Sequence, residues 1–435
     1  MKHPYSTIFS FSWPLIIANL SVPLLGIIDT AVLGHLNHPR YLAAVSVGAS
    51  LVTLILTSTN FLKMSATSLA AKNFQKPIQH SLTLFKSSVF FALLLAFFIL
   101  IMSPIFAHIG TKWLIDSNNS HQILANTTQY VQIRLFAAPA TLLNFIIVGW
   151  AIAWQKPKLA LISMTSSAMV NIVLDIVFII VLDLSTKGAA YASLIAEYVG
   201  LVCGAWVFYR SFPQLIQQNW CKFPTINKLR EIIKVNTDIS IRSFSLLFAM
   251  AYLNSQSTKL GLSTTAINAI LLQIVFLQSY ILDGITQSAE ALVGTQKSPD
   301  LQRFWIRKTL MASILSALLM CLLLTLIHPW IAPIFSAKPS IINGVETLLI
   351  WVIWLPLISI FCYWLDSIAI AVTASKAMRN STMIATFICF IPACWLLTPS
   401  GNHGLWTAFA IFILARSWLL FNYLKPYFKS LLIIK

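Results

Sequence analysis

The chain has 435 residues, of which 58% are hydrophobic and only 9% are charged, and its mean hydropathy is +0.81. Soluble domains carry about 25% charged residues, so this composition excludes a soluble protein and predicts a helical protein that crosses a membrane many times. The formal net charge is +17, but the basic residues are scattered at the ends of apolar runs rather than gathered in a stripe with aromatic residues, which argues against a nucleic-acid partner.

Twelve segments are apolar over a length of about 20 residues or more, which is what a spanning helix needs. We expect spans at 8–33, 42–70, 85–109, 128–153, 158–182, 187–209, 237–258, 262–293, 308–332, 345–373, 380–397 and 403–424. With the amino terminus in the cytoplasm, nineteen Lys and Arg residues fall on the inner side and five on the outer side. Because cytoplasmic loops are enriched in these residues, the bias supports twelve spans with both termini in the cytoplasm.

The first span carries an acidic residue, Asp29, near its far end. An ionised side chain deep in a bilayer costs roughly 2.5–3.5 kcal/mol on insertion scales, so such a residue usually faces a water-filled cavity. Pro14 and Pro23 in the same run each remove a backbone donor and permit a bend. A bendable helix with a titratable group is typical of a transport element.

The fifth span holds a second intramembrane acid, Asp175, and Asn171 precedes it by four residues on the same helical face. The sixth span opens with small residues that allow close helix packing, and Ser193 adds a hydroxyl group there. We expect Asp29, Asn171, Asp175 and Ser193 to converge as an oxygen-rich cage. Since burial favours the neutral form of a carboxyl group, such a cage could hold a proton or a monovalent cation. The alternative is that these groups only join helices by hydrogen bonds.

A polar connection at 211–236 is the longest in the chain and predicts a cytoplasmic linker between two six-helix lobes, 1–210 and 237–435. Because six is even, both lobes enter the membrane in the same direction, so a repeat would be parallel, about an axis along the membrane normal. The spacing from Arg134 to Pro139 in span four recurs from Trp351 to Pro356 in span ten. Arg134 and Glu197, two further embedded charges of the first lobe, are interpreted as structural.

Span seven begins with Asp238 and Arg242, which the i,i+4 spacing predicts to form an ion pair near the cytoplasmic face. Spans eight and ten carry further polar residues that are candidates for a second-lobe cavity: Gln273, Tyr280, Asp283 and Asp366. The alternative for the acids among them is pairing with Arg242, Arg303 or Arg379 across helices.

Other functional motifs are missing from the sequence. The six cysteines show no CxxC spacing and are expected to be small buried hydrophobic residues. The eight histidines form no metal-ligand pattern, and no Walker loop, GxGxxG or GxSxG occurs. We therefore expect no cofactor, no certain metal and no ATP-driven step.

Several stretches resemble the multidrug and toxic compound extrusion (MATE) transporters. The resemblance is carried in the first span by PLIIANLSVPLLGIIDTAVLGHL, in the fourth by YVQIRLFAAPATLLNFIIVGW, and in the fifth and sixth by NIVLDIVFII and GAAYAS. The DinF-like branch of the family is indicated by SYILDGITQSAEALVG at 279–294 and GNHGLWTAFAIFILAR at 401–416. The similarity covers nearly the whole chain.

The resemblance implies an all-α integral membrane protein with twelve transmembrane helices in two six-helix lobes related by a pseudo-two-fold along the membrane normal. It also implies a central V-shaped cavity, rocker-type alternating access, and export of cationic or amphipathic compounds driven by H⁺ or Na⁺. Matching positions give Asp29 the role of the family's first-helix aspartate, and Asn171 and Asp175 the role of its fifth-helix pair. Ser193 stands where this branch often has threonine, and Pro14 stands at the first-helix bend.

Two departures from the family pattern concern the second lobe. Span ten lacks the glycine pair that commonly follows the aspartate, here Asp366, and span seven does not cleanly match the acids of the Na⁺-driven branch. The resemblance therefore places coupling in the first lobe, with H⁺ as the first choice and Na⁺ at Asp29, Asn171 and Asp175 as the alternative.

We expect a secondary active multidrug exporter and not an enzyme: a multi-pass, monomeric antiporter of the bacterial cytoplasmic membrane that exchanges small organic, cationic compounds for H⁺ or Na⁺. One alternative is a lipid-linked saccharide flippase of a related superfold, which would carry a cationic central cavity, whereas the embedded groups here are mainly acidic. The other is an integral-membrane transferase, which would need a catalytic constellation, often in long extramembrane loops. The longest loop here is the linker at 211–236.

Overall fold

The computed structural model describes residues 3–34, 39–74, 76–114, 121–216, 226–335 and 338–433, without the side chains of 22–34, 39, 40, 42, 43, 78, 113, 114, 121, 215, 216, 226–228, 432 and 433. These residues are almost entirely helical. They form two compact units, an N-terminal unit of Ile17–Ile233 and a C-terminal unit of Lys234–Lys435 together with Met1–Ile16. The predicted division into 1–210, a linker at 211–236, and 237–435 stays a prediction.

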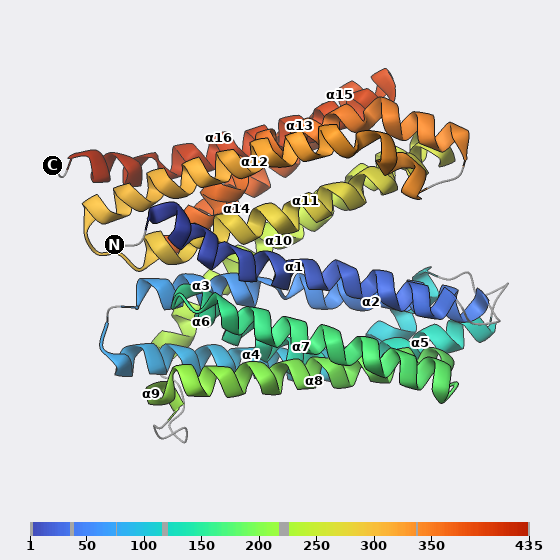
Figure 1. Cartoon of the computed structure of the whole chain (residues 1–435), viewed down its shortest axis with the longest axis horizontal. Coiled ribbons are helices and arrows are strands. Elements are labelled where there is room, and N and C mark those ends of the chain that lie inside the picture. The colour runs from blue at the N-terminus through green and yellow to red at the C-terminus, as the bar shows by residue number, and fades with distance from the viewer. Residues whose placement is uncertain are drawn as a thin grey trace. The chain divides into compact units, whose positions relative to one another are not determined.

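The N-terminal unit is a bundle of helices (Figure 1). It contains the second part of α1 (Pro4–Gly34), and then α2 (Pro39–Ser58), α3 (Phe61–Lys72), α4 (Ile78–Leu114), α5 (His121–Leu135), α6 (Ala138–Ala153), α7 (Pro157–Asp175), the π-helix η1 (Ile176–Val181), α8 (Ser185–Ser211), α9 (Pro213–Ile216) and the start of α10 (Ile226–Lys259). Proline begins α2 and α7, where its missing N–H would have had no helical partner.

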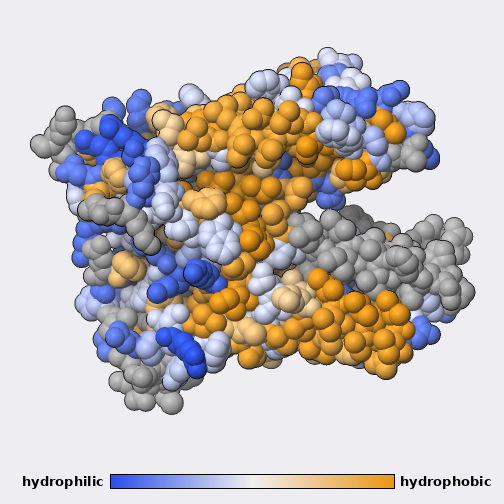
Figure 2. All heavy atoms as spheres, in the orientation of Figure 1, coloured by the Kyte–Doolittle hydropathy of each residue, from blue (hydrophilic) through white to orange (hydrophobic). Residues whose placement is uncertain are grey.

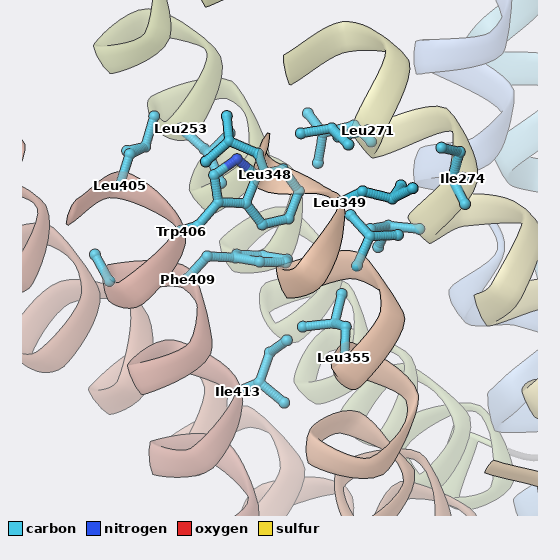
Figure 3. Packing of buried hydrophobic residues seen from close by; sticks show 14 of the residues in the cluster. Leu253, Leu271, Ile274, Leu348, Leu349, Leu355, Leu405, Trp406, Phe409 and Ile413 are labelled. Carbon is cyan, nitrogen blue, oxygen red and sulfur yellow. The ribbon is translucent and has the colours of Figure 1, made fainter. Parts of the chain in front are cut away.

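The C-terminal unit contains the remaining helices. They are the rest of α10, α11 (Leu262–Gly294), α12 (Pro299–Phe335), α13 (Pro339–Ala371), α14 (Ser375–Ile384), the π-helix η2 (Ala385–Phe390), α15 (Ile391–Leu397), the 3₁₀ turn η3 (Thr398–Ser400) and α16 (Gly401–Ile433). Its core gathers large apolar side chains from several helices, among them Leu253 of α10, Leu271 of α11, Leu348 of α13 and Trp406 of α16 (Figure 3).

Helices of membrane-spanning length account for most of the chain. Among the described residues, eight helical stretches are long and apolar enough to cross a membrane, and α5 with α6 makes a ninth. The longest stretch, Ser375–Leu431, contains two predicted spans, 380–397 and 403–424. Each of the twelve predicted segments coincides with one helix or with helices joined by a break. The outer face of α12 is apolar along much of its length (Figure 2), as a lipid-facing surface should be.

The same turn follows the fourth and the tenth predicted spans. After α6, the N–H of Lys156 donates to the carbonyl of Ala151 at 2.8 Å, and after α13 the N–H of Ala374 donates to that of Ala369 at 2.8 Å. The residue before each donor is left-handed, with φ of 57° at Gln155 and 59° at Thr373. Both are Schellman caps formed without glycine. Their corresponding places support the internal repeat that the span count predicts.

The two prolines of the recurring spacing, Pro139 and Pro356, have different effects on their helices. Pro139 lies in the first turn of α6, directly after a break where α5 and α6 meet at 44°. Pro356 lies within the continuous helix α13. Pro139 stands where a missing N–H costs no helical hydrogen bond, and Pro356 leaves α13 unbroken, so neither proline by itself accounts for the bend in the fourth span.

Candidate functional site

The predicted polar residues of the fifth and sixth spans meet in the N-terminal unit. The Nδ2 atom of Asn171 on α7 donates to the Oγ atom of Ser193 on α8 at 3.2 Å, between two side chains that are 3% and 8% exposed. Asp175 is completely buried, one helical turn beyond Asn171 on the same face. The structure therefore brings Asn171 and Ser193 into contact and places Asp175, a third predicted cage residue, one turn away on the same helix face.

Close packing of α7 against α8 makes this seam narrow, and the two helices run side by side in Figure 1. A Cβ atom added at Gly200 would lie 2.8 Å from the Cβ of Ser167, and one added at Gly204 would lie 2.8 Å from the Oγ of Ser163. The Oγ of Ser163 lies 2.6 Å from the Oδ1 of Asn144 and 2.9 Å from the carbonyl oxygen of Gly200. Small residues four apart thus let two backbones approach, as in membrane helix pairs generally.

A π-helical segment begins immediately after Asp175. The N–H of Leu182 closes it by donating to the carbonyl of Val177, five residues earlier, at 2.9 Å. Single π-turns inserted in α-helices are rare and occur frequently at functional sites. The acidic side chain therefore sits at the point where α7 widens, which no residue pattern in the sequence indicated.

The first-span residues are only partly described. Asp29 and Pro23 belong to α1, but their side chains lie outside the described residues. Pro14 is buried in α1. Asn19 is also buried, at 7% exposed, and an amide within an apolar run is the sequence signal that points to it.

In the C-terminal unit, Asp366 is the centre of a buried ion cluster. Its Oδ2 atom lies 2.5 Å from the Nη2 of Arg242 on α10 and 2.8 Å from the Nη2 of Arg416 on α16. All three side chains are 8–9% exposed. One of the pairings weighed for Asp366 is thus present, and its carboxylate is engaged by two guanidinium groups.

The predicted ion pair between Asp238 and Arg242 is wrong. The Oδ1 of Asp238 pairs with Nη1 of Arg379 at 2.6 Å, and its Oδ2 accepts a hydrogen bond from Ser375 at 2.8 Å. Arg242 pairs instead with Asp366. The i,i+4 contact is a weak surface interaction of about 0.2–0.5 kcal/mol, whereas buried charges require full compensation from whatever helix supplies it.

Other candidates for a second-lobe cavity separate into two groups. Tyr280 and Asp283 on α11 are partly exposed and interact electrostatically, and Asp283 also acts on Tyr363 of α13. The hydroxyl groups of Tyr363 and Ser279 are 2.8 Å apart. Gln273, by contrast, is exposed two turns earlier on α11.

No group of three or more His, Cys, Asp or Glu side chains that would suit a metal ion occurs in the part of the chain that the structure describes. A monovalent cation can also be bound by amide, hydroxyl and carboxyl oxygens, and Asn171, Ser193 and Asp175 carry one of each kind.

Comparison with known proteins assigns the chain to a family. The MatE family profile matches residues 14–177. The chain is 30% identical over 417 residues to DNA damage-inducible protein F of Escherichia coli K12, covering 93% of this chain and 88% of the relative. It is 22% identical over 300 residues to the multidrug export protein MepA of Staphylococcus aureus strain bovine RF122 / ET3-1, covering 67% of this chain and 64% of that protein.

Solved structures share the fold along almost the whole chain. A structure of MATE in the bent conformation superposes with a TM-score of 0.87 at 19% identity, covering 98% of this chain and 96% of the other. An outward-facing multidrug resistance MATE family transporter of the MOP superfamily gives 0.85 at 18%, with the same coverage. The fold, the family profile and the relative in Escherichia coli agree: this chain belongs to the MATE family of multidrug efflux transporters, in its DinF-like branch.

Proposed function

We propose that this chain is a secondary active exporter that exchanges cationic or amphipathic organic compounds for H⁺ by alternating access in the cytoplasmic membrane. Membership of a transporter family supports export, and one relative is named a multidrug export protein. The coupling ion and the compounds are our inference from the residues of the N-terminal unit. The protein is expected to act as a monomer without a cofactor.

The observation that carries the proposal is the complete burial of Asp175 at the end of α7. An ionised carboxylate within a span is expensive, so the group is either neutralised by a proton or balanced by a cation. Asn171 and Ser193 add polar atoms on the same seam. Asp29 of α1 is proposed to complete this site when the first helix bends.

Antiport requires that the ion and the exported compound exclude each other. In our proposal, proton binding at the Asp29 and Asp175 carboxyl groups removes the negative charge that holds a cationic compound. The two ligands are then coupled through one site, so each lowers the affinity of the other by the same factor. Release outside follows protonation, and loss of the proton to the cytoplasm resets the site.

The test uses purified protein in proteoliposomes with an imposed pH gradient and a fluorescent organic cation. We expect wild-type transport, and we expect Asp175→Asn and Asp29→Asn each to fall to the level of protein-free vesicles, because amides do not exchange the proton. Asp183→Asn is the matched control, since Asp183 is exposed just after η1. Asp183→Asn should transport like the wild type.

Transport measured separately under a pH gradient and under a Na⁺ gradient identifies the coupling ion. A pH gradient without Na⁺ should support transport, and a Na⁺ gradient at equal pH should not. Transport driven by Na⁺ alone would replace H⁺ by Na⁺ in the proposal. Unchanged transport in folded Asp175→Asn and Asp29→Asn variants would refute the coupling site.

A further inference from the structure

The break between α5 and α6 is held by two neighbouring residues of α8. The hydroxyl of Tyr198 donates to the carbonyl oxygen of Phe136, inside the break, at 3.1 Å. The carboxyl group of Glu197 interacts with the hydroxyl of Thr141 in the first turn of α6 and with the charge of Arg134. A break frees backbone carbonyls that need new partners within a membrane, and α8 supplies one of them.

Arg134, in the last turn of α5, is in an unusual state for a guanidinium group. Its Nε and Nη1 atoms are buried and have no hydrogen-bond partner among the described residues. Buried donors are almost always satisfied, so two of the three guanidinium nitrogens of Arg134 depart from the rule. Its charge is offset by Glu197, whose electrostatic interaction with it crosses from α8 to α5.

Glu197 is also linked to the candidate site. It follows Ser193 by four residues on α8 and so lies on the same side of that helix. Ser193 is hydrogen-bonded to Asn171, which lies four residues before Asp175. Polar groups therefore continue from Asp175 to the α5–α6 break.

The charged and titratable groups on the helices packed against α8 are few. On α5, Arg134 interacts with Glu197, and His121 and Tyr130 are the other titratable residues of that helix, while α6 contributes the hydroxyl of Thr141. On α7, Asp175 lies beyond the Asn171 and Ser193 pair, and Lys158 lies in the first turn at the far end. The other neighbours are η1 and α9, which carry no titratable side chain, and α2, which carries Arg40 and Tyr41 in its first turn.

We propose that Glu197 is a second proton-exchanging group of the N-terminal unit, and that its protonation releases Arg134 from the α5–α6 break. Ionised Glu197 balances the guanidinium charge. When the carboxylate takes up a proton from water, Arg134 is left buried without a counter-charge, which favours a conformation where water reaches it. The proton leaves when Arg134 returns. The role of this proton in coupling rests on the proposed function, whereas the release of Arg134 does not.

Hydrogen exchange of the full chain in nanodiscs, read on peptides covering residues 130–141, tests the proposal. After correction for the intrinsic pH dependence of exchange, wild-type protection of this break should fall by about tenfold from pH 8 to pH 5, the factor that about 1.4 kcal/mol of local stability produces. Glu197→Gln should show the low protection at both values. Glu197→Asp should restore the pH response.

Two further variants distinguish a pH-dependent release of Arg134 from a general loss of local stability. Arg134→Gln should be protected at both pH values, because no charge is left to release. Glu231→Gln, at a partly exposed acid that pairs with Lys72 at 3.8 Å, should respond like the wild type. A wild-type pH response in folded Glu197→Gln, or equal low protection in Glu197→Gln and Arg134→Gln, would overturn the proposal.

Transport measured on the same samples distinguishes this inference from the proposed function. Asp175→Asn should lose export and keep the pH response of the break. If wild-type protein shows that response but exports nothing, the proposed function fails and the switch stands. If wild-type protein exports and Glu197→Gln exports with an unchanged pH profile, the coupling role of Glu197 fails, and the release of Arg134 is decided by the hydrogen-exchange result alone.

Discussion

At the scale of single residues, the most constrained acid of the C-terminal unit is Asp366. It contacts Arg242 and Arg416 from two different helices, and the guanidinium of Arg416 also lies 5.6 Å from the ring of Phe412. Two positive charges and one negative charge would be an unfavourable cluster by themselves. Asp283, which acts electrostatically on Arg416, brings the balance close to zero. Such a cluster fixes α10, α13 and α16 to one another.

Removal of the central acid should therefore be severe. We expect Asp366→Ala to lower the stability of the protein by about 3–5 kcal/mol, because two buried guanidinium groups lose their common partner. Thermal unfolding in detergent, followed by tryptophan fluorescence, measures the loss. Asp300→Ala, at an exposed acid in the first turn of α12, is the control and should unfold like the wild type. Equal unfolding temperatures for the two variants would show that the ion cluster contributes little.

Residue patterns located some of these groups but not their partners. An i,i+4 pattern places Asn171 and Asp175 on one helix face, and the contact between Asn171 and Ser193 is made by the packing of α7 against α8. The same kind of pattern failed for Asp238 and Arg242, because the choice of partner for a buried charge is made between helices that are distant in sequence. The roles of Arg416 and of the neighbours of Glu197 depend on packing in the same way.

At the scale of helices, the candidate site depends on how closely α7 and α8 approach. Gly200 and Gly204 on α8 face Ser163 and Ser167 on α7 with no room for an added Cβ atom. Apolar runs of about 20 residues predicted these helices well, because length and hydropathy are properties of one segment. The break before Pro139 could not be predicted, because the donor to its Phe136 carbonyl comes from another helix. No residue pattern indicated the π-turn after Asp175.

A larger side chain at this seam should separate the two helices. We expect Gly204→Leu to destabilise the protein by about 1–3 kcal/mol through overpacking against Ser163, and to reduce proteoliposome transport by widening the Asn171 and Ser193 contact. Val202 lies two residues before Gly204, and its side chain is 65% exposed. Val202→Leu should therefore have little effect on stability or transport. Normal stability and transport in Gly204→Leu would mean that the seam has room the structure does not show.

At the scale of the whole chain, the sequence predicts orientation as well as helix count. The excess of basic residues on one set of loops predicts that this side lies in the cytoplasm. The fold is shared with a solved MATE structure along 98% of the chain. Which compound is exported is not encoded in any of these general features, because hydropathy and charge bias report on the bilayer and not on the cargo.

The orientation can be measured with reporters. We expect green fluorescent protein fused after Lys435 to fluoresce and alkaline phosphatase fused there to be inactive, because both reporters report a cytoplasmic carboxyl terminus. The opposite pair of results is expected for fusions truncated after Lys338, which the span order places outside. Active phosphatase at Lys435 would show that the number of crossings is odd or that the orientation is reversed.

The chain passes between the two compact units twice, and both passages lie inside helices. One is between Ile16 and Ile17 in α1 and the other between Ile233 and Lys234 in α10. Because both passages are helical rather than loops, a displacement of one unit against the other requires α1 and α10 to bend. Pro14 leaves the carbonyl of Ser10 without its usual helical donor two residues before the first passage, whereas α10 contains no proline. The passage in α1 is therefore expected to bend more easily than the passage in α10.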